Sequence, residues 1–301
     1  MKKVMLILFV MLALIGCTNI REKESDKEVT EAEILTIIAP TGAPALSLVN
    51  YVDEVGDADI TTVSGADNLQ AAFGSGSQDV ILAPINLGVK LIQNAAEEYC
   101  LLGVVTWGNL YLVENESIEE GKVVFFGESA VPGKVIHSLD LNLEGEVVWV
   151  EAVSDVTPLL LSKEAKYGIL AEPALTAALA KAKEAGVTLT VVADIQQLYN
   201  EKFGTKGYTQ AALFVKKDVL ESKKSEIDTL LSSMSSISTA DMSKIEGRES
   251  FYGVPSAAIA EKAFERMNIH YTDAEECTEE IGTFLKLFGI EEFESVLAGY
   301  E

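Results

Sequence analysis

Side chains that could recognise a small molecule lie in short loops that follow predicted strands. These loops supply glycines, hydroxyls, amides and one carboxylate, at residues 41–44, 64–66, 84–86, 107–109, 127–129 and 172–173. In an α/β sheet, ligands bind beyond the carboxyl ends of the strands, where glycine backbone and free helix N–H groups can approach them. Taken singly, each loop is better explained as an ordinary turn. Their coincidence at one end of the predicted sheets indicates a binding site.

Trp107 is the most distinctive of these residues. It stands with Gly108 and Asn109 between two apolar runs, residues 101–105 and 110–113. Such runs are typical of buried strands, so we predict one strand that leaves a first sheet and enters a second, forming a hinge. We expect Trp107 to face the resulting cleft and to stack on a flat or cationic solute. The alternative is a core tryptophan at the junction of two lobes.

Two further loops carry side chains of ambiguous role. Glu172 precedes Pro173 at a strand end, where its carboxylate could accept hydrogen bonds from a ligand or could simply favour the N-terminus of the next helix. Glu128 shares this ambiguity, and Ser129 beside it offers a hydroxyl.

Groups needed for catalysis or anion capture are missing from these loops. The three arginines, Arg21, Arg248 and Arg266, all lie elsewhere, although arginine forks usually bind sulfonate or phosphate. His137 and His270 fall in helical patterns and lack partners at metal-binding spacing. The sequence therefore predicts no catalytic residue, no metal site and no cofactor, and it favours a neutral or cationic ligand.

The remaining pattern predicts two sets of strand–helix units. Strands and amphipathic helices alternate from residue 34, which indicates mostly parallel sheets with right-handed crossovers. The pattern restarts after the first crossover, where Trp149 is expected in the core, and residues 208–215 predict a second crossover. Beyond it we expect helices only, at about residues 218–235, 256–267, 276–288 and 291–298, packed on the first lobe.

The N-terminus predicts export. Lys2 and Lys3 precede an apolar stretch, residues 4–14, that is too short for a stable membrane span, and Cys17 follows Gly16. This resembles a bacterial lipobox, which would make residues 1–16 a signal peptide and Cys17 the lipidated mature N-terminus. The alternative is an ordinary signal peptide with a chance cysteine. Residues 17–33 are polar and lack aromatics, so we expect a disordered tether.

Composition narrows the choice of partners. The 301 residues carry a formal charge of -24, which argues against nucleic acid or an anionic membrane surface as a partner. Membrane contact is thus expected through the lipid anchor alone. Cys100 and Cys277 could be bridged or free, and Cys100, at the head of an apolar strand, favours a buried thiol.

Several of these segments resemble the bacterial ABC-importer solute-binding lipoproteins of the nitrate/sulfonate/taurine and thiamine-pyrimidine-precursor superfamily. The resemblance runs from about Ile34 to Asp218 and is carried by residues 38–46, 79–87, 101–113, 167–176 and 210–217. It implies a type II periplasmic-binding-protein fold, in which two α/β lobes are joined by two strands. The lobes would comprise residues 34–108 with 210–301, and residues 109–209.

The resemblance also implies a ligand between the lobes. The ligand-binding positions would be Thr41, Gly42, Ala43, Asn86, Trp107, Asn109, Ser129 and Glu172. The expected protein is a monomeric solute receptor on the extracytoplasmic face of the cell membrane that delivers a small, planar molecule to ABC permease subunits. A sensory lipoprotein is the alternative. A pyrimidine-precursor enzyme of this fold is less favoured, because its histidine- and cysteine-rich clusters are missing.

Overall fold

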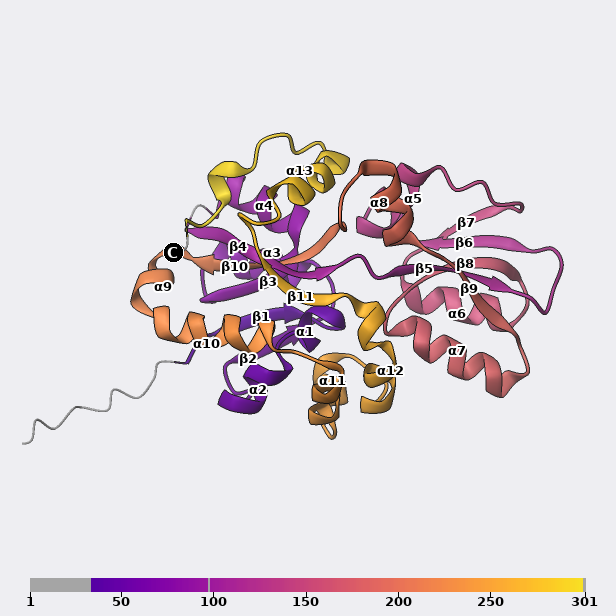
Figure 1. Ribbon diagram of the computed structural model, residues 1–301, viewed down its shortest axis with the longest axis horizontal. Coiled ribbons are helices and arrows are strands. Elements are labelled where there is room, and N and C mark those ends of the chain that lie inside the picture. Colours follow the sequence, from indigo (N-terminus) through magenta and orange to yellow (C-terminus); the bar gives the residue numbers. More distant parts are fainter. Residues whose placement is uncertain (1–33, 97, 300–301) are drawn as a thin grey trace, which may run out of the picture. The chain divides into compact units, whose positions relative to one another are not determined.

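The computed structural model describes residues 34–96 and 98–299, in which strands and helices alternate as the apolar pattern predicts (Figure 1). The signal peptide, the lipidation site Cys17 and the tether predicted within residues 1–33 lie outside the described residues.

A six-stranded sheet combines the strands before the first crossover with two later ones. Its order is β11-β4-β10-β3-β1-β2. β1 is parallel to β2 and β3, whereas β10 is antiparallel to β3 and β4, and β11 is antiparallel to β4. The strands are β1 (Ile37–Pro40), β2 (Ile60–Val63), β3 (Val80–Pro84), β4 (Tyr99–Trp107), β10 (Thr209–Lys216) and β11 (Ile269–Asp273).

A five-stranded sheet contains the strands between the crossovers, in the order β7-β6-β8-β5-β9. β6 is parallel to β7 and β8, and β5 is antiparallel to β8 and β9. The strands are β5 (Leu110–Asn115), β6 (Lys122–Phe126), β7 (Val147–Val150), β8 (Ala165–Ala171) and β9 (Leu189–Asp194). Trp149, expected in the core, is only half-buried in the edge strand β7.

Most strands of each sheet run in one direction, as predicted, but both sheets are mixed, because β10 and β11 run against the rest of the six-stranded sheet and β5 against the rest of the five-stranded one. The two crossovers explain why β10 and β5 are reversed. The chain leaves the six-stranded sheet at the end of β4 and returns at that same end, so β10 must run against β4. For the same reason β5 enters its sheet where the neighbouring strands end, and it runs against β8 and β9.

The first predicted crossover is confirmed, because β4 ends at Trp107 and β5 begins at Leu110 in the other sheet. The second lies slightly earlier than predicted. All of β10 pairs within the six-stranded sheet, so the chain passes between the sheets at residues 204–208, after helix α8 (Ile195–Phe203). The exact limits of the two lobes remain a prediction.

Helices flank both sheets (Figure 1). α3 and α4 pack on strands of the six-stranded sheet, and α6 and α7 pack on the five-stranded one. The α-helices are α1 (Ala43–Leu46), α2 (Val49–Val55), α3 (Asp67–Ser75), α4 (Ile85–Asn94), α5 (Val131–Leu139), α6 (Val153–Leu161), α7 (Ala174–Ala185), α8 (Ile195–Phe203), α9 (Lys217–Ser222), α10 (Lys224–Ser235), α11 (Glu249–Tyr252), α12 (Ala257–Met267) and α13 (Thr278–Leu285). Short 3-10 helices are η1 (Thr239–Ile245), η2 (Lys286–Phe288) and η3 (Glu294–Val296).

The C-terminal region is not all helical. β11 joins the edge of the six-stranded sheet and contains His270, which the sequence pattern had placed in a helix. Of the helix predicted at residues 291–298, the structure has only the single 3-10 turn η3. β11 escaped prediction because five residues with three polar side chains are too short to show an alternating pattern.

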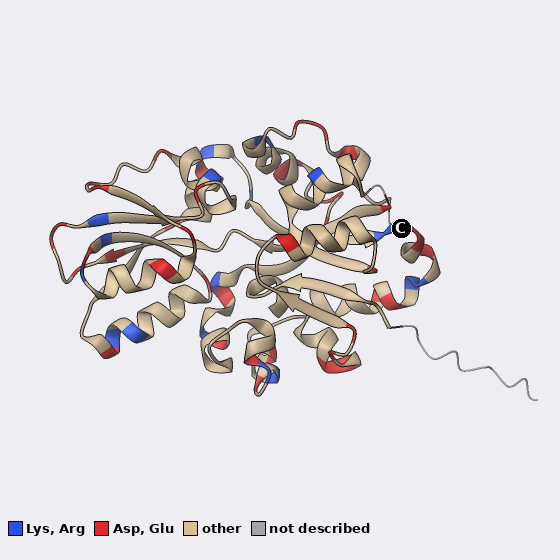
Figure 2. Cartoon of the chain, turned by 180° about the vertical axis from the view of Figure 1, so that it is seen from behind, with Lys and Arg blue, Asp and Glu red and all other residues tan. Residues whose placement is uncertain are grey.

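The described helices and the surface charge bear on the predicted location. Among residues 34–96 and 98–299, no helix is long and apolar enough to cross a membrane. In the view of Figure 2, acidic residues (red) and basic residues (blue) are interspersed over helices and loops. The charge therefore marks no single basic face in this view.

The six-stranded sheet is packed on α3 and α4 through an aromatic cluster. Phe214 of β10 has its ring centroid 5.4 Å from that of Phe73, which itself lies 5.2 Å from Tyr99. Gly88 of α4 faces the Phe214 ring so closely that an added Cβ would collide with it. Gly74 of α3, in contrast, has no atom within 4 Å of an added Cβ.

Alanine at these two helical glycines should therefore change stability in opposite directions. We expect Gly88→Ala to lower the free energy of unfolding by about 1–3 kcal/mol, because the buried ring of Phe214 must shift. Gly74→Ala should raise it by about 0.5–1 kcal/mol through helix propensity. Urea unfolding followed by circular dichroism measures both, and equal effects of the two variants would contradict the packing described.

Candidate functional site

A cavity of about 650 Å³ is bordered by elements of both sheets. The loop after β1, the β10 strand and the segment before α12 border it on one side. The first crossover, the loop after β8, and helices α6 and α7 border it on the other. Its lining residues are Thr41, Gly42, Ala43, Pro44, Asn109, Val153, Ser154, Thr157, Pro158, Leu161, Ala171, Glu172, Pro173, Ala174, Ala177, Ala178, Lys181, Gln210, Gly253 and Pro255.

The cavity brings together five of the eight residues that the sequence singled out. Thr41, Gly42, Ala43, Asn109 and Glu172 line it, although they come from three separate loops. The other three are not among its lining residues. Asn86 is half-buried at the start of α4, Ser129 is exposed before α5, and Trp107 borders a different hollow.

The backbone around Thr41 is held by its own neighbours. Gly42 has φ 92° and donates its N–H to the carbonyl of Tyr252, 2.8 Å away. Gly253 also approaches Thr41 closely, since an added Cβ would lie 2.5 Å from the Thr41 Cβ. This loop therefore lines the cavity in a fixed conformation, and the N–H of Gly42 is already bonded.

Glu172 is buried and fully engaged. Its carboxylate accepts hydrogen bonds from the backbone N–H and hydroxyl of Thr176, at 3.0 and 2.9 Å, and from Arg266 Nε at 2.6 Å. Arg266 also donates to the Thr176 hydroxyl, at 2.8 Å. The Glu172 side chain has 0% exposed surface, against 38% for Arg266. Arg266 reaches this position from α12, far outside the loops in which arginines were sought.

Glu172 also fixes Asn109. Its backbone N–H donates to the Asn109 carbonyl at 3.1 Å, and its own carbonyl accepts from Asn109 Nδ2 at 3.3 Å. A reversed amide would set two oxygens against each other, so this contact orients the Asn109 side chain. Asn109 is only 2% exposed, and its Oδ1 accepts no hydrogen bond from the described residues.

Gln210 reaches the cavity through an irregularity in β10. Thr209 pairs with Trp107 and Ala211 with Thr106, so Gln210 is an extra residue without a partner on β4. Such a β-bulge re-aims side chains and is frequent beside functional sites. The Oε1 of Gln210 is buried and, like Asn109 Oδ1, lacks a hydrogen-bond donor among the described residues.

The remaining walls of the cavity are mainly apolar. Alanine, proline, valine and leucine from α6, α7 and the two flanking loops make up most of the lining. Its charged lining residues among those described are the engaged Glu172 and the exposed Lys181. A concave apolar site with a few fixed polar groups is typical of small-molecule binding.

Trp107 borders a second hollow of about 270 Å³, together with Lys206, His270, Thr272, Glu276, Cys277 and Glu280. Its indole stacks on the imidazole of His270, with centroids 5.3 Å apart and planes within 4°. Trp107 is 5% exposed, which matches the alternative of a packed tryptophan at the junction. Its part in binding a solute remains a prediction, and the cavity described above does not contain it.

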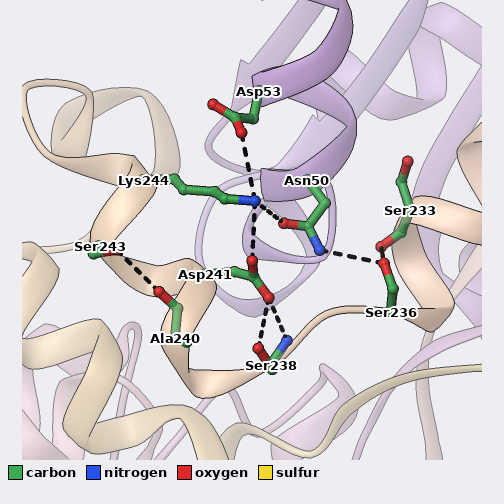
Figure 3. Close-up of polar contacts among 9 residues, drawn as sticks. All are labelled: Asn50, Asp53, Ser233, Ser236, Ser238, Ala240, Asp241, Ser243 and Lys244. Atoms are coloured by element: carbon green, nitrogen blue, oxygen red, sulfur yellow. Dashed lines mark hydrogen bonds and ion pairs between the residues drawn. The ribbon is translucent and has the colours of Figure 1, made fainter.

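A third hollow, of about 580 Å³, is a polar groove formed by α2, α10 and η1. Lys244 is at its centre and contacts Asn50 Oδ1 at 2.8 Å, Asp241 at 3.0 Å and Asp53 at 3.4 Å (Figure 3). These three acceptors use all three ammonium protons. The groove is thus explained by contacts within the chain.

Metal and thiol chemistry have little support in the described residues. No group of three or more His, Cys, Asp or Glu side chains in residues 34–96 and 98–299 is arranged to hold a metal ion. Cys100 and Cys277 are both free and buried. Burial raises the pKa of the Cys100 thiol to about 11 and that of Cys277 to about 12, so neither is a reactive thiolate near neutral pH.

The two sheets and the cavity between their loops define the fold of the periplasmic solute-binding proteins of ABC transporters. An ABC transporter structure from Parabacteroides distasonis matches with a TM-score of 0.73 and 21% identity, over 89% of this chain and 95% of that one. The periplasmic aliphatic sulphonate binding protein SsuA from Escherichia coli matches with a TM-score of 0.61 and 13% identity, over 89% and 93%. No family model and no curated protein sequence matches the chain.

Sequence reasoning missed the helical walls of the cavity. Val153, Thr157 and Leu161 recur every four residues on α6, and Ala174, Ala177 and Lys181 recur every three or four on α7. This spacing shows that they share one face of each helix. A cavity-facing stripe of this composition resembles a core-facing stripe, so the sequence offered no signal to separate the two.

The Glu172–Arg266 contact should contribute measurably to stability. Arg266→Met leaves a buried carboxylate without its cation, and we expect a loss of about 2 kcal/mol in the free energy of unfolding. Arg248→Met is the matched control, because Arg248 lies 3.9 Å from Asp57 in an exposed pair and should contribute less than about 0.5 kcal/mol. Urea unfolding at pH 7 compares them, and equal losses would show that Glu172 does not depend on Arg266.

His270 should make stability depend on pH. Burial lowers its pKa in the folded protein, so the unfolded chain binds the proton first once the pH falls below about 6.5. Its contribution is complete above that pH and is lost on further acidification. The stability of the wild type relative to His270→Gln should therefore decrease from pH 7 to pH 5 in chemical unfolding. His137→Gln provides the control, and a constant difference for His270→Gln would refute the assignment.

Proposed function

We propose that this protein is an extracytoplasmic solute receptor of an ABC importer, which binds a small molecule in the 650 Å³ cavity and delivers it to a permease. The observation that carries the proposal is the cavity itself, because residues attached to both sheets border it. The fold shared with solute-binding proteins of ABC transporters supports the same role. Attachment to the membrane through a lipid on Cys17 belongs to this proposal.

The proposed mechanism is closure of two lobes around the solute. A solute that contacts residues of both sheets stabilises the closed arrangement by its differential affinity for that state. The two crossovers would act as the hinge, because they are the backbone connections between the sheets. The apolar lining and the engaged state of Glu172 favour a neutral or cationic solute.

The proposal predicts a solute that is lost when the cavity is filled. Native mass spectrometry of protein purified from its own cells should show a bound small molecule, and adding this molecule should raise Tm. Ala177→Phe places a ring in the cavity and should abolish both signals. Ala180→Phe, on the exposed side of the same helix, should retain both.

The outcomes of this experiment separate the possibilities. A solute retained by Ala177→Phe would show that binding occurs elsewhere. Protein that takes up no solute from a cell extract would contradict the receptor role. Uptake of the identified solute by cells lacking this protein, measured with a radiolabel, then tests delivery to a permease.

A further inference from the structure

We infer that the C-terminal end of α12, residues 266–268, is a clasp that holds the two lobes in the closed arrangement before any solute binds. This inference rests on the proposed closure of two lobes, and it assigns the restraint on opening to contacts outside the cavity. α12 belongs to the lobe of the six-stranded sheet, because Ala260, Ala263 and Met267 are buried in the apolar core of that lobe. The same helix lies against α7 of the other lobe (Figure 1).

Arg266 bonds to two separate elements of the five-stranded lobe. Its Nε donates to the carboxylate of Glu172 at 2.6 Å, and its Nη2 donates to the hydroxyl of Thr176 at 2.8 Å, both at the start of α7. The backbone carbonyl of Arg266 accepts a hydrogen bond from the Tyr111 hydroxyl of β5, at 2.9 Å. One residue of the six-stranded lobe is therefore tied to the other lobe through both its side chain and its backbone.

Asn268 ties the same end of the helix to the first crossover. Its carbonyl accepts the N–H of Trp107 at 3.0 Å, and its Nδ2 donates to the carbonyl of Gly108. These bonds lie at the connection about which the proposed lobes turn, so they can persist as the angle changes. The bonds of Arg266 differ, because Glu172 borders the cavity from the five-stranded lobe. A rotation that widens the cavity draws Glu172 away from Arg266.

The buried charge gives this restraint its direction. In the closed arrangement the Glu172 side chain has 0% exposed surface, whereas Arg266 has 38%. Thr176 lies on the same helix start as Glu172, so its donors stay with the carboxylate when the lobes separate. Without the guanidinium, the closed arrangement holds a buried carboxylate that lacks a cation, whereas opening lets water reach it. Loss of Arg266 therefore penalises the closed arrangement and spares the open one.

The clasp bears on how tightly a solute binds. A solute that binds the closed arrangement has an apparent affinity proportional to the fraction of protein already closed. Arg266 does not line the cavity, yet as a positioning residue it raises the affinity for any solute that the cavity accepts. Affinity is thereby set partly by the clasp, and selectivity is left to the cavity walls.

Distances between two spin labels test the clasp in protein that was unfolded and refolded to remove any solute. Ser250→Cys in α11 and Lys183→Cys in α7 place the labels at exposed positions on opposite sides of the cavity. Cys17→Ser removes one competing thiol, and Cys100 and Cys277 are buried and react slowly. Double electron–electron resonance then gives the distribution of distances between the lobes.

The wild type should show mainly the distance of this structure. In Arg266→Met, the ratio of a longer to this shorter distance should rise about tenfold or more, because the buried charge has lost its partner. Combining Arg266→Met with Glu172→Gln removes the charge itself and should return the ratio to within about threefold of the wild type. Gly88→Ala is the control for lost stability, because it strains the packing of α4 within one lobe and should keep the wild-type distribution.

A milder variant keeps the test decisive if Arg266→Met does not fold. Tyr111→Phe removes only the hydroxyl that bonds the Arg266 carbonyl, so the ratio should rise about threefold.

Four results would overturn the inference. An unchanged distribution in Arg266→Met, or in Tyr111→Phe where the first variant does not fold, would show that the contact turns with the hinge. An equal change in Gly88→Ala would show a loosened fold. A double variant as open as Arg266→Met would refute the role of the charge, and a wild type dominated by the longer distance would show that the clasp does not hold. The receptor role fails separately, if the wild-type protein takes up no solute from a cell extract.

Discussion

A buried carboxylate determines how this site is built. Glu172 is withdrawn from water at the end of β8, and an unpaired charge there would cost several kcal/mol. Thr176 supplies two donors from the same helix start, and Arg266 supplies the countercharge from α12, which leads into β11 of the other sheet. The need to pair one charge thus connects elements on both sides of the cavity. It also orients Asn109, which is bonded to the backbone of Glu172 on two sides.

The ion pair between Glu172 and Arg266 shows that the fold alone does not determine which solute binds. The fold is that of ABC-transporter solute-binding proteins, one of which binds aliphatic sulphonates. Here the arginine nearest the cavity is already occupied by Glu172, and the walls are mostly apolar. A shared arrangement of strands fixes where a ligand lies, whereas a few side chains decide which ligand it is.

The sequence predicted the loops that border the cavity better than the contacts between distant segments. Loops at strand ends are marked by local signals, and so Thr41, Asn109 and Glu172 were found before the structure. The direction of Trp107 was not local information, because it depends on pairing with β11, about 160 residues later. The bulge at Gln210 depends on register between β4 and β10, and Arg266 meets Glu172 across 94 residues. Contacts of such separation leave no trace in the composition of either segment.

The first crossover, residues 107–109, contains one residue placed by long-range pairing and one that local signals identified. Trp107 stacks on His270 in one hollow, and Asn109 borders the 650 Å³ cavity. Between them, the N–H of Gly108 donates to Gln196 Oε1 at 2.7 Å. A closing motion of the proposed lobes must change the backbone of this segment, since it joins the two sheets. Such a motion would act on the backbone that carries both the oriented amide of Asn109 and the stacked indole of Trp107.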